Sequence, residues 1–180
     1  MPNMTVLAPK NDRELEEMLA FAVSFDGPIA IRYPRGSAHQ GLQEYQAPVE
    51  YGRSEIIRKG KKIAVLGVGS MIPSCMEICK GLKDDGYDPT FVNARFVKPL
   101  DVDLLDELAK DHSLFVTVEE NVKSGGYGEH VSAYMEACHP EIRVLSAAVW
   151  DRFVPQGNVE SLRSRIGLGV EDIRQAIEED

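Results

Sequence analysis

The sequence lacks the features of a membrane protein, a disulfide-bonded protein or a nucleic-acid-binding protein. It has no apolar run long enough to span a bilayer, so we expect no membrane partner. It has only three cysteines, an odd number, which argues against a disulfide framework and favours a cytoplasmic location. It also lacks positive charge. The net charge of -9 argues against a nucleic-acid partner, because a phosphate backbone needs a basic face.

The beginning of the chain, residues 1–36, predicts a strand–helix–strand unit. Residues 4–9 form a short β-branched stretch, and residues 11–23 carry apolar side chains at helical spacing. Asn11 and Glu14 have the spacing of a capping box, and a second apolar strand follows the next Gly-Pro pair. A parallel strand needs neighbours, so we expect this unit to be the end of a larger domain, with its sheet edge covered by a neighbouring molecule.

Residues 37–50 show no sustained period and read as a linker, and residues 51–180 form the second predicted domain. In that domain, continuous apolar strands alternate with amphipathic helices. This alternation predicts an α/β fold with a mostly parallel five-stranded sheet and helices on both faces. The first two strands of the domain are predicted on either side of a Lys-Gly turn. Only one or two helical turns are predicted from Val159 onward.

The stretch "GVGSM" resembles the start of a dinucleotide-binding loop. It supplies Gly67 and Gly69, but the third glycine would fall at Ile72. We favour a tight turn in which Ser70 caps the next helix. A freestanding doubly wound module that binds a nucleotide here remains the alternative function.

A second glycine-rich stretch, with Gly125, Gly126 and Gly128, precedes a predicted helix and could cradle a phosphate on its amide groups. Glu119, Glu120 and Glu129 would oppose an anion there, with only Lys123 to offset them, so we favour a close-packed turn or an interface loop.

Cysteine and histidine suggest neither a metal site nor a nucleophile. Cys75 and Cys79 share one helix face, but no second pair stands at ligand spacing, so we expect core cysteines and no metal ligand. The four histidines are scattered and no serine or cysteine nucleophile stands beside them, so no catalytic residue is assigned.

Four arginines follow predicted strands. Arg95 and Arg152 would be buried and structural, paired with a carboxylate such as Asp101 or Asp151. Arg32 and Arg35 follow the buried strand of "GPIAIRYPRG". Beside Pro34, the guanidinium of Arg32 would stand on a rigid platform suited to bidentate binding of phosphate or carboxylate. From the residues alone, an interdomain salt bridge is an equal alternative for Arg32.

Five segments occur in an order that resembles the C-terminal part of the 1-deoxy-D-xylulose-5-phosphate synthase family, a branch of the transketolase-like thiamine diphosphate enzymes. They are "MTVLAPKNDRELEEML", "GPIAIRYPRG", "NARFVKPLD", "VTVEENVKSGGYG" and "DRFVPQG". The resemblance runs over essentially the whole chain. Transketolases and the beta subunits of 2-oxo acid dehydrogenases, which share the fold, are the alternatives within this superfamily.

The resemblance implies that residues 1–36 end a pyrimidine-binding middle domain and that residues 51–180 form a transketolase-type C-terminal domain. It implies a homodimeric transferase that uses thiamine diphosphate and magnesium to condense pyruvate with glyceraldehyde 3-phosphate, releasing carbon dioxide. This chain would need the rest of that protein as its partner, and we expect it alone to bind no cofactor or metal and to be inactive. One residue role carries over: Arg32 resembles the arginine that binds the phosphate of the acceptor aldehyde, with Arg35 as a weaker second candidate.

Overall fold

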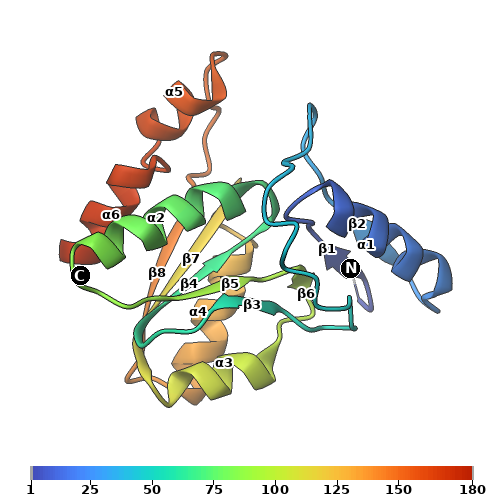
Figure 1. Ribbon diagram of the computed structural model, residues 1–180, viewed down its shortest axis with the longest axis horizontal. Helices are drawn as coiled ribbons and strands as arrows, with labels where there is room; N and C mark the ends of the chain where they lie inside the picture. The colour runs from blue at the N-terminus through green and yellow to red at the C-terminus, as the bar shows by residue number, and fades with distance from the viewer. Residues whose placement is uncertain (1, 180) are drawn as a thin grey trace.

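The computed structural model describes residues 2–179, which form two sheets flanked by helices (Figure 1). The first sheet has the strand order β2-β1-β6 and the second has the order β3-β5-β4-β7-β8. In chain order the elements are β1 (Thr5–Leu7), α1 (Asp12–Ser24), β2 (Ile29–Ile31), β3 (Glu55–Arg58), β4 (Lys62–Gly67), a 3-10 turn (Gly69–Met71), α2 (Ile72–Asp84), β5 (Thr90–Asn93), β6 (Phe96–Lys98), α3 (Val102–Ala109), β7 (His112–Val122), α4 (Tyr127–Cys138), β8 (Arg143–Val149), α5 (Val159–Arg165) and α6 (Val170–Glu179).

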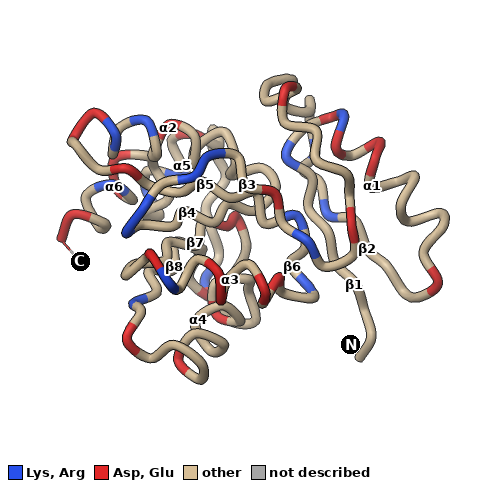
Figure 2. The backbone as a smooth tube through the Cα atoms, turned by 60° about the horizontal axis from the view of Figure 1, so that its bottom comes forward, with Lys and Arg blue, Asp and Glu red and all other residues tan. Residues whose placement is uncertain are grey.

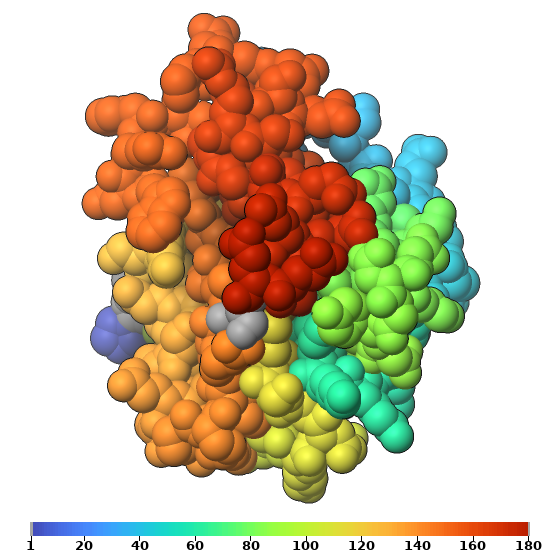
Figure 3. Space-filling model, turned by 90° about the vertical axis from the view of Figure 1, so that its left-hand side faces the viewer, coloured from blue at the N-terminus to red at the C-terminus, as the bar shows by residue number. Residues whose placement is uncertain are grey.

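The five-stranded sheet confirms the predicted fold class. Strands β5, β4, β7 and β8 are parallel, and only β3 at the edge runs antiparallel. Side chains alternate between its two faces, as a period of two requires. Val65 and Val116 pack in the core beneath α2 and α6, whereas Leu66 and Phe115 pack in the core against α3 and α4. Figure 3 shows α6, in red, lying against α2, in green.

The first sheet contains a strand that the sequence did not predict. β1 pairs with β2 in parallel, and its other edge pairs antiparallel with β6. The chain itself therefore covers the edge of β1, and β2 is left as an outer edge of this sheet. That a neighbouring molecule covers the exposed edge stays a prediction. Leu7, Met18 and Phe96 form the small core of this sheet, so β6 contributes packing as well as hydrogen bonds.

One further expectation is confirmed and another needs correction. β3 and β4 follow each other on either side of the Lys-Gly turn, as predicted, and β5 lies between them in the sheet. The region after Val159 holds more structure than one or two turns, because α6 follows α5 and buries Ile173 and Ile177 against the core. The predicted division into residues 1–36, 37–50 and 51–180 remains a prediction. β6 belongs to the third of these segments but pairs with β1 in the first, so the two segments share one sheet.

Charged residues of both signs are interspersed over the chain (Figure 2). Within residues 2–179, no helix combines the length and the apolar character that crossing a bilayer requires.

The three cysteines differ in burial, and this difference makes a simple prediction. Cys75 and Cys79 are buried in α2, whereas Cys138 at the end of α4 is exposed. Burial raises the pKa of Cys79 to about 12 and that of Cys75 well above its usual value, so neither forms the reactive thiolate at neutral pH. We expect iodoacetamide to modify only Cys138 in the native protein and all three after denaturation, as counted by mass spectrometry. Rapid modification of Cys75 or Cys79 in the native protein would contradict the packing of α2.

Candidate functional site

A cleft lies where the loop after β2 meets the carboxyl ends of β4 and β7. Ligands of open α/β sheets bind at this end of the strands. The larger part of the cleft has a volume of about 570 Å³, and a smaller part of about 200 Å³ adjoins it. Both parts are lined by Tyr33, Pro34, Ser70 and Glu120, so they form one continuous site.

Arg32 lines the smaller part of the cleft. Its backbone N–H donates to the carbonyl of Leu7 (2.8 Å), which continues the pairing of β2 with β1 and fixes where the side chain starts. Within residues 2–179, the guanidinium makes no ion pair and no side-chain hydrogen bond. The alternative of an interdomain salt bridge therefore has no partner in this part of the chain. Phosphate binding by Arg32 stays a prediction, and the observed position suits it.

Arg35 lines the larger part of the cleft and is exposed. It comes from the same loop as Arg32, on the other side of Pro34. The two guanidiniums therefore serve adjoining parts of one cleft, and the secondary binding role predicted for Arg35 stays untested.

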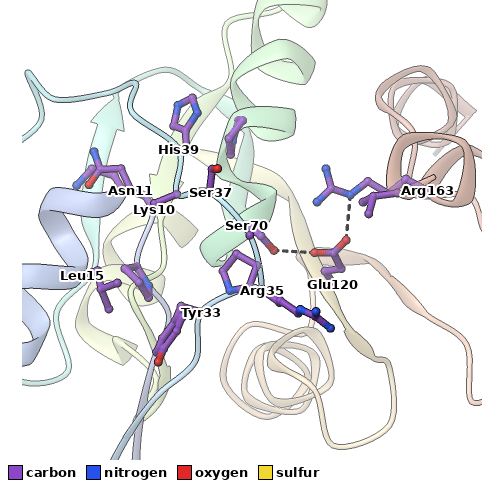
Figure 4. Close-up of a pocket in the computed structure, with 16 residues that line it drawn as sticks. Lys10, Asn11, Leu15, Tyr33, Arg35, Ser37, His39, Ser70, Glu120 and Arg163 are labelled. Carbon is purple, nitrogen blue, oxygen red and sulfur yellow. Dashed lines mark hydrogen bonds and ion pairs between the residues drawn. The ribbon is translucent and has the colours of Figure 1, made fainter. Parts of the chain in front are cut away.

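Glu120 is the acidic residue at the centre of this cleft. Its Oε2 accepts a hydrogen bond from the Ser70 hydroxyl (2.8 Å), and its Oε1 accepts one from Nε of Arg163 on α5 (3.1 Å), as Figure 4 shows. Partial burial opposes its ionisation. The hydrogen bonds from Arg163 and Ser70, with the positive charges of Arg163 and Arg32, outweigh that effect and hold the pKa of Glu120 below its usual value.

Ser70, Glu120 and Arg163 were not predicted as site residues. Ser70 was expected to cap α2, but its hydroxyl donates to Glu120, and α2 starts without a side-chain cap. Glu120 was named only as one of the acidic residues that would oppose an anion at the glycine-rich loop, and as part of a family segment. Arg163 lies in a region where few turns were expected. The three come from distant parts of the chain, so no local spacing could have linked them.

Behind the cleft, a buried network of charges joins the two sheets. Lys10 contacts Glu14 and Glu55 at 2.9 and 2.8 Å, and Arg95 contacts the same carboxylates at 2.7 and 3.2 Å. The amide of Asn93 donates to both carboxylates. Two cations and two anions balance, which is the condition under which charges are tolerated away from water.

Arg95 is the hub of this network and only 1% exposed. Its remaining N–H groups donate to the carbonyls of Ala47 and Pro48, at 2.7 and 2.9 Å. Its φ of 53° lies in the left-handed region, which costs a non-glycine residue about 1–3 kcal/mol and indicates that the surrounding contacts hold it there. The structural role predicted for Arg95 is confirmed.

The predicted partner of Arg95 is wrong, because Glu14 and Glu55 take the place expected for Asp101. The Asp101 carboxylate instead caps α3 and pairs with Arg53. Burial opposes the ionisation of Glu55, but the hydrogen bond from Lys10 and the charge of Arg95 outweigh it and lower its pKa.

The predicted burial of Arg152 is also wrong. Arg152 is exposed in the loop after β8, and so is the neighbouring Asp151. Phe153, beside them, is fully exposed as well.

The glycine-rich loop after β7 uses its glycine amides within the chain. The amides of Gly125 and Gly128 already donate to Glu129 (2.6 Å) and Glu119 (2.8 Å). A side chain at Gly126 would meet the carbonyl oxygen of Val122. Gly126 and Gly128 are buried, as a close-packed turn requires, and the alternative of an interface loop stays a prediction.

The "GVGS" turn is likewise packed. A Cβ at Gly67 would meet the sulfur of Cys75, and Gly69 has a φ of 52°, a conformation that glycine adopts readily. Packing at Gly67 and the positive φ at Gly69 explain why glycine stands at both positions, without a bound nucleotide. The Ser70 hydroxyl donates to Glu120.

Residues 52–173 match the family model described as Transketolase, C-terminal domain. The chain is 43% identical over 174 residues to 1-deoxy-D-xylulose-5-phosphate synthase of Lachnoclostridium phytofermentans. It is 40% identical over 178 residues to the protein of the same name from Dictyoglomus thermophilum. These alignments cover 96% and 98% of this chain but 28% and 29% of the relatives, so the chain spans less than a third of their length.

Two solved structures are similar in fold. One is described as "Split gene transketolase, inactive beta4 tetramer". It has a TM-score of 0.89 and 28% identity, and the alignment covers 99% of this chain and 57% of that one. The other is a transketolase from Campylobacter jejuni, with a TM-score of 0.69 and 17% identity over 100% of this chain and 27% of that one. At that identity the second likeness shows the fold alone.

Proposed function

This chain belongs to the family of transketolase C-terminal domains, and on that premise we propose that it is the C-terminal portion of a 1-deoxy-D-xylulose-5-phosphate synthase. The support is the identity of 43% and 40% to synthases of that name over nearly the whole chain. The whole enzyme would condense pyruvate with glyceraldehyde 3-phosphate and release carbon dioxide. The chain itself would contribute one wall of the acceptor site and have no synthase activity alone.

Thiamine diphosphate would supply the carbon nucleophile of this reaction, and magnesium would hold its diphosphate. Within residues 2–179, no group of three or more histidine, cysteine or acidic side chains is placed to hold a metal ion. We assign the magnesium–diphosphate end of the cofactor to the parts of the relatives that this chain does not span.

The observation that carries the proposal is the guanidinium of Arg32. It lines a cavity at the carboxyl ends of parallel strands and has no ion pair or side-chain hydrogen bond within residues 2–179. Arginine offers a planar fork of donors that matches phosphate oxygens in pairs. In the proposed enzyme it binds the phosphate of glyceraldehyde 3-phosphate and orients the aldehyde. Tyr33 and Pro34 form the adjoining wall.

The proposal predicts a substrate-selective loss when Arg32 is removed. In an active synthase containing this chain, we expect Arg32→Ala to lower kcat/KM for glyceraldehyde 3-phosphate roughly tenfold to a hundredfold. A charge-assisted contact contributes about 1.5–3 kcal/mol. The KM for pyruvate should change little because pyruvate has no phosphate. Steady-state kinetics with a phosphorylated and an unphosphorylated acceptor measure both effects.

Arg35→Ala is the matched control and should cause a smaller loss, because the Arg35 side chain is more exposed than that of Arg32 and lines the other part of the cleft. Equal losses with phosphorylated and unphosphorylated acceptors after Arg32→Ala would refute the phosphate role and indicate a structural one.

We propose that the complete enzyme is a homodimer in which this chain is joined to the remainder of the synthase. The support is the 28–29% share of the relatives that this chain spans, which leaves most of the protein elsewhere. A related split-gene transketolase is described as an inactive tetramer of its beta chain, which is consistent with a C-terminal chain that associates but does not catalyse alone.

A further inference from the structure

The proposed phosphate site contains a carboxylate that ought to weaken it. Glu120 lines both the part of the cleft that holds Arg32 and the part that holds Arg35 and Arg163. A fixed negative charge several ångströms from a phosphate repels it, and a partly hydrated cleft screens that repulsion only in part. The function proposed for Arg32 does not explain why an acidic residue stands there.

Glu120 is held in this position by two separate elements. Its two oxygens are taken by Ser70, in the turn after β4, and by Arg163, on α5. Figure 4 shows these bonds as a continuous line across the cleft. The side chain is 33% exposed, so it faces the cleft and is not sealed in the core. Because both oxygens are engaged, the carboxylate cannot easily swing away when an anion enters.

Arg163 is not the sole group that lowers the pKa of Glu120. The positive charge of Arg32 also acts on Glu120, together with the contacts from Arg163 and Ser70. Glu120 and Arg32 line the same small part of the cleft without forming an ion pair. A phosphate that binds Arg32 there meets the negative charge of Glu120 close by.

We propose that Glu120 sets the affinity of the Arg32 site for phosphate, as a fixed counter-ion that keeps anion binding there weak and reversible. This inference rests on the proposed phosphate role of Arg32. In the proposed reaction both the acceptor and the product carry a phosphate. Binding both tightly would not raise the rate and would slow product release. Glu120 is thus an affinity-determining residue of the acceptor site.

The test uses inorganic phosphate as the probe and this chain in low-salt buffer, followed by backbone amide chemical shifts. We expect Glu120→Gln, which keeps the shape and removes the charge, to tighten phosphate binding about threefold to tenfold. Glu120→Asp, which keeps a charge, should stay within about twofold of the native affinity. If the glutamine variant does not fold, Glu120→Ala carries the same expectation.

The matched control is Glu136→Gln, the same substitution at an exposed position on α4. It changes the net charge equally and should leave phosphate affinity within about twofold, because Glu136 lines neither part of the cleft. The double variant Arg32→Ala with Glu120→Gln should bind phosphate more weakly than Glu120→Gln alone.

The outcomes separate the two proposals. If Arg32→Ala weakens phosphate binding but Glu120→Gln fails to tighten it, the role of Glu120 is overturned and the proposed function stands. If phosphate binds equally well with and without Arg32, the proposed function fails and the role of Glu120 fails with it. Absence of measurable binding in both the native chain and Glu120→Gln also overturns the role of Glu120.

Discussion

Replacing Arg95 with methionine is expected to lower the free energy of unfolding by about 3–5 kcal/mol, the cost of breaking a buried ion pair by removing one partner. Methionine fills a similar volume, so the loss comes from charge and hydrogen bonding and little of it from a cavity. Among residues 2–179, Lys10 would be the one cation left in contact with Glu14 and Glu55. The carbonyls of Ala47 and Pro48 would also lose their donors. Urea unfolding followed by circular dichroism measures the change.

Arg13→Met is the matched control, because Arg13 also pairs with a glutamate, Glu17, but on the exposed side of α1. Exposed ion pairs contribute about 0–1 kcal/mol, so we expect a loss in that range. Losses of similar size for Arg95→Met and Arg13→Met would show that the buried network does not hold the two sheets together.

Phe115→Ala is expected to destabilise the chain by about 3–5 kcal/mol, the usual cost of removing a buried aromatic ring. Phe115 is 0% exposed in β7 and packs in the core against α3 and α4. Its ring also meets His112 edge-on, with centroids 6.4 Å apart. The same urea titration applies, and the midpoint should fall without a large change of slope.

Phe153→Ala provides a control with the same chemistry. Phe153 lies in the loop after β8 and is 105% exposed, so truncation removes almost no packing within this chain. Surface substitutions of this kind change stability by less than about 0.5 kcal/mol. A loss above about 1 kcal/mol for Phe153→Ala would mean that the loop packs against something in solution.

Hydrophobic periodicity predicted most of the second sheet, because its buried strands are nearly continuous apolar runs. "KIAVLG" and "TFVN" lie side by side in the observed sheet, as two parallel strands. β6 was missed for the opposite reason. It has three residues, of which only Phe96 is buried, and its strand character comes from pairing with β1. A strand that depends on a distant partner leaves little local signal.

The residues of the candidate site also differ in whether their local sequence predicts them. Arg32 was predicted because a strand expected to be buried and a proline flank it locally, although in the structure Ile29 and Ile31 of β2 are only half-buried and Ala30 is exposed. Glu120 and Arg163 gain their roles from a contact across 43 positions of sequence, which no local pattern reports. For Glu14 the sequence predicted one contact and missed others. The capping interaction of Asn11 with its amide was foreseen and is present at 2.9 Å. The Glu14 carboxylate, however, is committed to Lys10 and Arg95.

The placement of β6 bears on how genes of this kind can recombine. A crossover within the predicted linker would take β1 from one parent and β6 from the other, and would likewise separate Glu14 from Arg95. Each parent's sheet edge and buried charges would then have to match those of the other. We therefore expect viable chimeras between relatives to have crossovers before Thr5, so that the strand pair and its charges are inherited together.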